Sequence, residues 1–227
     1  LPTTGSGWIA KWNTRDPAHL RDIRTTVGMV FQVPENQIVA SIVEEDVAFG
    51  PENVGIPEDE LRQRVDWALA AVGLGELRHR ASHLLSAGQS QRLAIASALA
   101  MCPRCLLLDE CTSMLDPAGR RQFHDIIREL HSSGITIIAA THDMAAAARA
   151  QRIIVLSKGR VALQGSPHFV FRQEASLHAL QLDVPPAARV ARRIAARVHG
   201  FAADALTVAE VVDSVAGLAA RIPGALQ

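Results

Sequence analysis

The sequence predicts an α/β fold with a parallel core sheet. Residues 106–108 and 135–140 are apolar runs, and such runs are typical of buried parallel strands. Between them, residues 117–131 repeat apolar side chains at helical spacing. A strand, a helix and a strand in this order form a βαβ unit, which we expect to be right-handed with parallel strands.

The first part of the chain alternates short strands, loops and helices. Residues 8–12 and 27–31 alternate or run apolar and predict short strands, and residues 33–56 predict a loop with short helical pieces. Pro57 begins a helix with acids against its N-terminal dipole. The predicted buried face of this helix consists of Leu61, Val65, Leu69 and Val72, and Gly73 and Gly75 end it.

A second helix is predicted over residues 89–101, directly after Ser86-Ala87-Gly88. A helix N-terminus offers unpaired amides and partial positive charge to an anion, and Gly88 would let a phosphate approach closely. The alternative is that Ser86 only caps a core helix. The inward positions of this helix are Leu93, Ala96 and Leu99 or Ala100.

The later elements follow the same alternation. Asp116-Pro117 predicts the start of the helix over 117–131, and Gly134 stops it before the strand over 135–140. Residues 152–156 and 161–163 predict a hairpin around Lys158-Gly159. The predicted buried stripe of the helix is Phe123, Ile126, Ile127 and Leu130.

Residues 175–227 differ in composition and predict a small helical appendage. They are rich in Ala, Val and Arg, and Pro185-Pro186 marks a break. The helix that follows carries Val190, Ile194 and Val198. Its four arginines favour a solvated face or a protein contact over anionic lipid or nucleic acid; they are Arg189, Arg192, Arg193 and Arg197.

Leu106-Leu107-Leu108 runs directly into Asp109 and Glu110. Ligands in open α/β sheets lie beyond the carboxyl ends of the strands, and two carboxylates there can hold Mg²⁺ and activate a water. The alternative is a strand that ends in a solvated acidic turn. The βαβ unit brings Glu110 and His142 to the same edge of the sheet, which favours a site.

Composition excludes several classes of protein. Lys+Arg and Asp+Glu are both 23, and this balance argues against a nucleic-acid binder. No apolar run approaches the ~18 residues of a membrane span, and no signal peptide is recognisable. We therefore expect a cytosolic chain that touches a membrane only through a partner. Cys102, Cys105 and Cys111 have no further zinc ligands at suitable spacing, so buried, reduced thiols are expected.

In order and spacing, five motifs resemble the nucleotide-binding subunit of ABC transporters. Gln32 is similar to the Q-loop glutamine, Ser86 to Gln89 to the LSGGQ signature, and Asp109-Glu110 to the Walker B pair. Asp116 is similar to the D-loop aspartate and His142 to the switch histidine. Two positions depart from the pattern: Ala87 replaces the first signature glycine, and Cys111 stands where the family usually has proline.

A finer resemblance points to energy-coupling-factor importers, which take up vitamins and transition metals such as cobalt or nickel. It rests on residues 27–53, which read VGMVFQVPENQIVASIVEEDVAFGPEN, and on Leu182 to Pro186 and Leu206 to Glu210 in the tail. The resemblance implies a P-loop NTPase-like ABC ATPase with a helical signature subdomain. It divides the chain into a nucleotide-binding domain over 1–174 and a helical extension over 175–227.

The resemblance also implies the residue roles. Two subunits would sandwich two ATP molecules, with Glu110 as general base and His142 orienting it. Mg²⁺ would be held by Asp109 and Gln32. The implied ATP-binding residues are Gln32, Ser86, Ala87, Gly88, Gln89 and Asp116.

The sequence contains no G-x-x-x-x-G-K-[ST] phosphate loop. The resemblance places that loop before Leu1, so we expect an N-terminally incomplete chain, from a truncated gene or a misassigned start, or else a degenerate subunit. Either would bind ATP poorly and hydrolyse it hardly at all.

The resemblance implies a peripheral protein on the cytoplasmic face of the cell membrane. The expected partners are a second ATPase subunit, identical or related, a transmembrane coupling subunit docked on Pro34 to Val39, and a substrate-binding membrane subunit. No nucleic acid is expected. The predicted function is ATP hydrolysis that energises import. The alternatives are a non-catalytic ABC-like subunit and a soluble ABC ATPase; for a DNA-repair ATPase, the 53 residues between Gln32 and Ser86 are too few for a long coiled coil.

Overall fold

The computed structural model describes residues 4–220, and the ends of both predicted domains, 1–3 and 221–227, lie outside the described residues. Contacts divide the chain into two compact units, Leu1–Ala140 and Thr141–Gln227, which we describe separately. The predicted boundary between residues 174 and 175 rests on family resemblance and stays a prediction.

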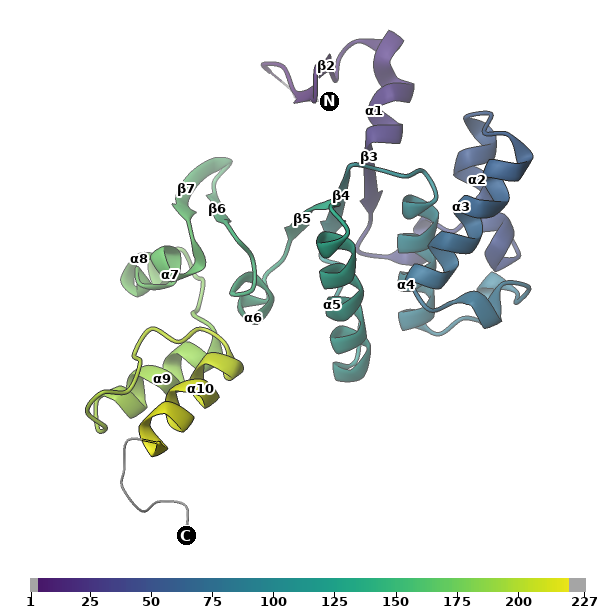
Figure 1. Ribbon diagram of the computed structural model, residues 1–227. Helices are drawn as coiled ribbons and strands as arrows, with labels where there is room; N and C mark the ends of the chain where they lie inside the picture. The colour runs from purple at the N-terminus through teal and green to yellow at the C-terminus, as the bar shows by residue number, and fades with distance from the viewer. Residues whose placement is uncertain (1–3, 221–227) are drawn as a thin grey trace. The chain divides into compact units, whose positions relative to one another are not determined.

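The first unit contains a three-stranded parallel sheet. Its strands are β3 (Val27–Val30), β4 (Cys105–Asp109) and β5 (Thr136–Ala140), in the order β3-β4-β5 (Figure 1). Both neighbours of β4 run parallel to it, with Leu106 beside Gly28 on one side and Ile137 on the other. The predicted α/β class and the parallel strand pair are confirmed.

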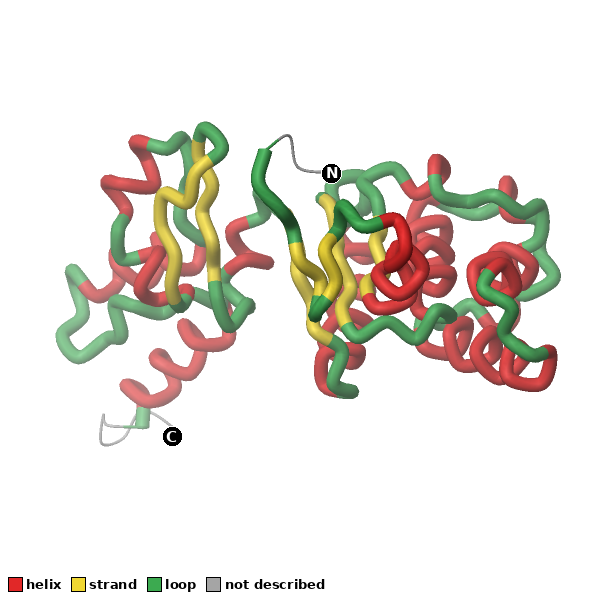
Figure 2. The backbone as a smooth tube through the Cα atoms, turned by 90° about the horizontal axis from the view of Figure 1, so that it is seen from above, coloured by secondary structure: helices red, strands yellow, loops and turns green. Residues whose placement is uncertain are grey.

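The core lies on one face of this sheet. Leu106 is fully buried and Leu108 is nearly so, and both belong to a cluster shared with α4 (Ala87–Leu99) and α5 (Pro117–Ser132). Gly28 permits the close approach of sheet and helix, because a Cβ there would lie 3.1 Å from Leu106 Cδ1 and 3.3 Å from Ala98 Cβ. Figure 2 shows the strands beside these helices. On α4 the predicted inward positions Leu93, Ala96, Leu99 and Ala100 are all fully buried.

A helical part packs against α4. It consists of α2 (Val43–Asn53) and α3 (Glu58–Ala71), followed by the short 3-10 helices η3 (Gly75–Leu77) and η4 (Ser82–Leu84). The predicted helix after Pro57 is confirmed. Gly73 ends it with a φ of +65°, a conformation that favours glycine. Of the predicted face, Val65, Leu69 and Val72 are buried and Leu61 is half-buried.

The loop predicted over residues 33–56 is wrong in its second half. A 3-10 helix, η2 (Pro34–Asn36), is followed by the 11-residue helix α2. Pro51 lies in the last turn of this helix. The helix forms because Val43 and Val47 bury one face against α3 and α4, which outweighs the weak local propensity.

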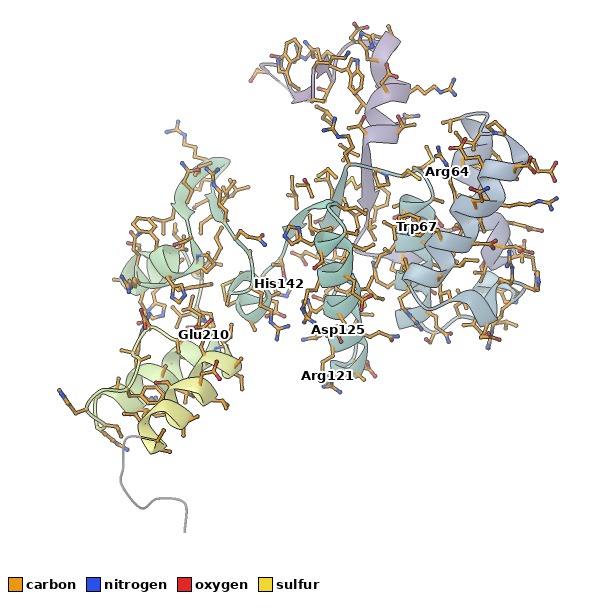
Figure 3. All side chains as sticks on the ribbon, viewed as in Figure 1. Arg64, Trp67, Arg121, Asp125, His142 and Glu210 are labelled. Atoms are coloured by element: carbon orange, nitrogen blue, oxygen red, sulfur yellow. The ribbon has the colours of Figure 1, made fainter. Side chains whose placement is uncertain are left out.

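Helix α5 is one-sided, as predicted. Phe123, Ile126 and Leu130 are buried and Ile127 is half-buried, whereas Arg121 and Asp125 are exposed on the outer face (Figure 3).

The expectation that the strand over 135–140 is buried is wrong. Ile138 on β5 is 55% exposed, while Ile137 packs against the core cluster. The physical reason is that Ile138 lies on the sheet face opposite Leu106, in register with Leu107 and Met29, which are not buried either.

The N-terminal segment forms a small hairpin and a helix. The strand predicted over residues 8–12 is two short antiparallel strands, β1 (Trp8–Ile9) and β2 (Trp12–Asn13), because the chain turns at Ala10, which has a φ of 52°. A 3-10 helix, η1 (Pro17–His19), and α1 (Leu20–Thr26) follow.

The second unit combines a hairpin with short helices. β6 (Ile153–Ser157) and β7 (Arg160–Gly165) are antiparallel, and Lys158 and Gly159 join them with φ values of 49° and 73°, which confirms the predicted turn. Among the described helices, none is long and apolar enough to cross a bilayer. The helices of this unit are α6 (Met144–Ala147), α7 (Pro167–Phe171), α8 (Glu174–Ala179), α9 (Pro186–Ala195) and α10 (Val208–Ala219).

The buried side chains of α9 are small. Val190 and Val198 are exposed, and Ala188 and Ala191 are buried instead. Small side chains allow close approach of α9 to its neighbours, so the helix turns its alanines inward.

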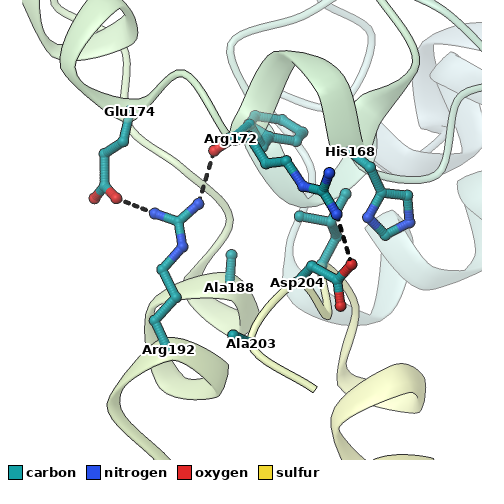
Figure 4. Close-up of a pocket in the computed structure, with 9 residues that line it drawn as sticks. His168, Arg172, Glu174, Ala188, Arg192, Ala203 and Asp204 are labelled. Carbon is teal, nitrogen blue, oxygen red and sulfur yellow. Dashed lines mark hydrogen bonds and ion pairs between the residues drawn. The ribbon is translucent and has the colours of Figure 1, made fainter. Parts of the chain in front are cut away.

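Ion pairs fix this arrangement within the second unit. Arg192 pairs with Glu174 and donates to the carbonyl of Phe171 at 2.7 Å. Arg172 pairs with Asp204 at 2.9 Å, and both ion pairs line one pocket of this unit (Figure 4). Arg189 bonds Asp183 at 3.0 Å. Of the four arginines predicted to face solvent or protein, Arg189 and Arg192 are therefore paired within the chain.

We expect Leu106→Ala to lower the free energy of unfolding by about 2–5 kcal/mol, because it leaves a cavity in the sealed core. Ile138→Ala, in the neighbouring strand but half exposed, should cost less than about 1 kcal/mol. Urea denaturation followed by circular dichroism measures both variants. Equal losses would contradict the one-sided core.

Candidate functional site

The candidate site lies at the carboxyl end of β4. Asp109 is the last residue of the strand and pairs in register with Ala140 of β5. Glu110 follows, and its backbone N–H donates to the Ala140 carbonyl at 3.0 Å. Asp109 is exposed and Glu110 is half-buried. The two adjacent carboxylates are thus delivered to the open edge of the sheet, where ligands of α/β folds bind.

Gln32 meets Glu110 at this edge. It follows β3, and its Nε2 donates to Glu110 Oε2 at 3.3 Å. The two residues are 78 positions apart in the chain, and the parallel pairing of β3 with β4 brings them together. This contact unites one of the predicted ATP- and Mg²⁺-binding residues with the predicted general base.

Glu110 is held in a left-handed backbone conformation, with a φ of 46°. Its carbonyl accepts hydrogen bonds from the backbone N–H and the hydroxyl of Ser113, at 3.1 and 3.0 Å. A non-glycine residue is strained in this region, and such strain is concentrated at functional sites.

The buried side chain of Cys111 holds the turn after β4 against β3. Its side chain is 5% exposed, and its Sγ lies 3.5 Å from the carbonyl of Val30, two residues before Gln32. Burial raises the pKa of the Cys111 thiol to about 11. The expectation of buried thiols holds for Cys111. It is wrong for Cys102, which is exposed in the loop before β4, and for Cys105, which is half-buried at the first position of β4.

The residues of the predicted signature motif lie at the start of α4. Ser86 caps the helix: its Oγ accepts from Gln89 N at 3.4 Å, and Gln89 Oε1 accepts from Ser86 N at 2.9 Å. The capping role considered for Ser86 is therefore real. It is compatible with anion binding, because the first amides of a helix, here those of Ala87 and Gly88, have no intrahelical acceptor.

Gly88 is not required by the packing of the chain itself. A Cβ at this position would meet only Leu115 Cδ2, at 4.0 Å. Leu115 precedes Asp116, which caps α5 by accepting from Gly119 N at 2.6 Å. The start of α4 and the predicted D-loop therefore lie close together within the first unit.

His142 lies in the second unit, two residues after the end of β5 (Figure 3). Its side chain is exposed. It sits in a short turn in which Asp143 N donates to Thr141 Oγ1 at 3.0 Å and Asp143 caps α6. The predicted meeting of His142 with Glu110 stays a prediction.

The donors at this edge fit Mg²⁺ with water and phosphate rather than a full protein cage. Among residues 4–220, no group of three or more His, Cys, Asp and Glu side chains could hold a metal ion. Asp109, Glu110 and Gln32 supply hard oxygen atoms, and Mg²⁺ is usually bound by one or two carboxylates together with substrate phosphates.

Two positioning residues were missed by sequence analysis. Asp46, only 2% exposed, accepts from the amides of Val39 and Ala40 at 2.7 and 3.0 Å. Gln37 donates to Met29 O at 3.1 Å and accepts from Phe31 N at 3.2 Å. Asp46 could have been noticed because it shares the buried face of its helix with Val43 and Val47, at i, i+3 and i+4. Nothing in the local pattern marks Gln37.

Comparisons with known proteins define the class. A family model described as ABC transporter matches residues 1–113. The solved structure of cbiO1 from Clostridium perfringens, part of the ABC transporter complex cbiONQ, has a TM-score of 0.67 and 38% identity over 81% of this chain and 68% of that one. A dimeric ATP-binding cassette in a post-hydrolysis state, bound to ADP and phosphate, has a TM-score of 0.64 and 30% identity over 73% of this chain and 75% of that one. Fold and sequence thus define an ABC transporter ATP-binding domain.

Two curated relatives narrow the class. Both are named energy-coupling factor transporter ATP-binding protein EcfA1. The protein from Caldanaerobacter subterraneus subsp. tengcongensis is 48% identical over 216 residues, 95% of this chain and 78% of the relative. The protein from Symbiobacterium thermophilum is 49% identical over 222 residues, 97% of this chain and 77% of the relative. The chain belongs to the energy-coupling factor family of ABC transporter ATP-binding proteins.

We expect Glu110→Gly to raise the free energy of unfolding by about 0.5–1 kcal/mol, because glycine adopts the left-handed conformation without strain. Glu110→Ala removes the same carboxylate but keeps the strain, and it should bring no gain. Urea denaturation of both variants separates backbone strain from charge repulsion with Asp109. Equal stabilities would show that the turn is not strained.

The folded chain should lose stability as pH rises from 9 towards 11. The pKa of Cys111 is about 11 in the folded chain against an ordinary 9.0, so the unfolded chain loses this proton first and unfolding becomes easier. Denaturation across this pH range, compared with Cys111→Ala, measures the effect. A variant with the same pH dependence as the parent chain would contradict it.

Proposed function

We propose that this chain is the ATP-binding and ATP-hydrolysing subunit that energises an energy-coupling factor importer for a micronutrient, either a vitamin or cobalt or nickel. The observation that carries the proposal is the contact of Gln32 with Glu110 at the end of β4, in a member of this family. The contact joins the predicted Mg²⁺- and ATP-binding residue Gln32 to the predicted general base Glu110.

Glu110 acts in this proposal as the general base on the attacking water. Its strained turn fixes the carboxylate at the sheet edge, and Gln32 donates a hydrogen bond to it. Asp109 and Gln32 would hold Mg²⁺, and His142 would orient Glu110 and hydrogen-bond the γ-phosphate. When bound, Mg²⁺ neutralises the charge of the phosphates. The remaining catalysis is positioning of the water against the phosphorus.

The start of α4 acts across a dimer. Ser86, Gly88 and the amides of the first turn approach the phosphate held by the second subunit, with Ala87 and Gln89 beside them. The open space at Gly88 and the first amides of α4, which have no intrahelical acceptor, support this role. Asp116 links the two sites. The similar ATP-binding cassette with ADP and phosphate is a dimer, which supports a dimeric arrangement here.

The partners follow from the same proposal. The docking segment, Pro34–Val39, contacts a transmembrane coupling subunit, and a substrate-binding membrane subunit selects the solute. This arrangement places the chain peripherally on the cytoplasmic face of the membrane.

In the assembled transporter, Glu110→Gln should lower the rate of ATP hydrolysis at the site that contains Glu110 by about 100-fold or more, because the general base is lost. ATP should remain bound, since the amide keeps the shape of the side chain. Phosphate release and retained nucleotide measure the two effects. Glu129→Gln, at an exposed position of α5, is the matched control and should leave both unchanged.

Hydrolysis at that site that persists in Glu110→Gln would contradict the assignment of the general base. Failure of the chain to co-purify with membrane subunits would favour a soluble ABC ATPase. An assembled pair with no hydrolysis in the parent protein would favour a non-catalytic subunit.

A further inference from the structure

The docking segment is held to β3 by one side chain. Gln37 bonds the carbonyl of Met29 and the amide of Phe31, at 3.1 and 3.2 Å. These two groups flank Val30 on the edge of β3 that faces away from β4. The side-chain amide of Gln37 therefore pairs with this edge as the backbone of a neighbouring strand would.

The far end of the docking segment is held by a buried carboxylate. Asp46 on α2 accepts from Val39 N and Ala40 N through Oδ1, and its Oδ2 accepts from the hydroxyl of Ser97 at 2.8 Å. Ser97 lies on α4. A buried carboxylate is tolerated only when donors satisfy it, and charge-assisted hydrogen bonds are the stronger kind. One side chain thus joins three elements: the end of the docking segment, α2 and α4.

Helix α4 links this junction to the signature motif. Ser97 and Ser86 are about three turns apart on one continuous helix. The helix is rigidly packed, since Leu93, Ile95 and Leu99 are fully buried. A displacement of α4 at Ser97 must therefore move its N-terminus, where the predicted phosphate-binding amides lie.

A second connection runs over the surface. Glu44, at the start of α2, pairs with Arg78 at 2.9 Å and with His79 at 2.7 Å, and Ile42 forms a bridge with Ala81. The charged partners are partly or largely exposed, and exposed pairs contribute little. Backbone hydrogen bonds add to it: Val43 N donates to Arg80 O at 3.1 Å and Glu44 N donates to Arg78 O at 2.9 Å. This connection holds α2 to residues 78–82, whereas Asp46 joins the docking segment to α4.

We propose that Asp46 is a positioning residue that couples the docking segment to the signature helix α4. This inference rests on the proposed function. Movement of the docking segment by a membrane partner pulls on Val39 and Ala40, and Asp46 passes the movement through Ser97 to α4. In the reverse direction, closure of the dimer on nucleotide moves α4 and so displaces the docking segment.

The link itself is tested in the chain alone by hydrogen–deuterium exchange. Asp46→Ala should reduce the protection of the Val39 and Ala40 amides about tenfold or more, because their acceptor is lost. Ser97→Ala should leave this protection intact, because Oδ1 of Asp46 remains in place. Unchanged protection in Asp46→Ala would overturn the proposed anchoring of the segment.

The coupling is tested in the assembled transporter with Ser97→Ala, which removes the α4 hydroxyl that lies 2.8 Å from Asp46 Oδ2 and 3.1 Å from the Leu93 carbonyl. We expect solute uptake per ATP hydrolysed to fall about fivefold while the rate of hydrolysis is kept. Ser132→Ala, on α5, is the matched control. The Ser132 hydroxyl bonds the Arg128 carbonyl four residues earlier, just as the Ser97 hydroxyl lies near the Leu93 carbonyl, but Ser132 has no link to the docking segment. Uptake per ATP equal to that of the control would overturn the proposal.

Failure of the proposed function and failure of the coupling role give different results. If the parent transporter neither hydrolyses ATP nor takes up solute, the proposed function is wrong. If the parent transporter works and Ser97→Ala works equally well, only the coupling role of Asp46 is wrong.

Discussion

The parallel pairing of β4 on both of its edges positions everything at the candidate site. Its apolar side chains Leu106 and Leu108 are sealed against α4 and α5, so the strand cannot slide without exposing them. The register then fixes where the strand ends, and with it the places of Asp109 and Glu110. Because β3 is locked to the same strand, Gln32 is delivered to the same edge.

This rigidity supports a strained residue. Glu110 occupies a left-handed conformation that glycine would adopt at lower cost, and the structure holds it there through Ala140, Ser113 and the buried Cys111 below it. A proline at the position of Cys111, which the family resemblance led us to expect, would restrict the backbone locally. Here a buried thiol contact to β3 provides the anchoring instead, so that the same turn is stabilised through the tertiary structure.

The helical part serves the site in another way. Its helices carry no group that reacts, yet α4 presents its N-terminus and α2 contributes the buried Asp46. Most of its buried residues are apolar, and the buried carboxylate of Asp46 is satisfied by groups from two other elements. A polar junction in an apolar core specifies one arrangement of the packed elements, since any shift leaves a charge without donors. Gln37 fixes the docking segment to β3 in a similar way, because its side-chain amide bonds the Met29 carbonyl and the Phe31 amide.

By itself, the sequence determined the elements that carry the chemistry. The apolar run into two acids predicted β4 and its edge, the spacing of Phe123, Ile126 and Leu130 predicted α5, and the order of motifs indicated the family. These are local signals, set by periodicity and by residue type.

Only the tertiary structure decided the rest. It turned the expected loop after Gln37 into α2, because burial of Val43 and Val47 outweighed an unpromising local sequence. It left one face of β5 exposed, since burial depends on what packs beside a strand and not on its composition. It also brought together Gln32 with Glu110 and Asp46 with Ser97, pairs 78 and 51 residues apart, whose meeting depends on how strands and helices pack and therefore leaves no local trace in the chain.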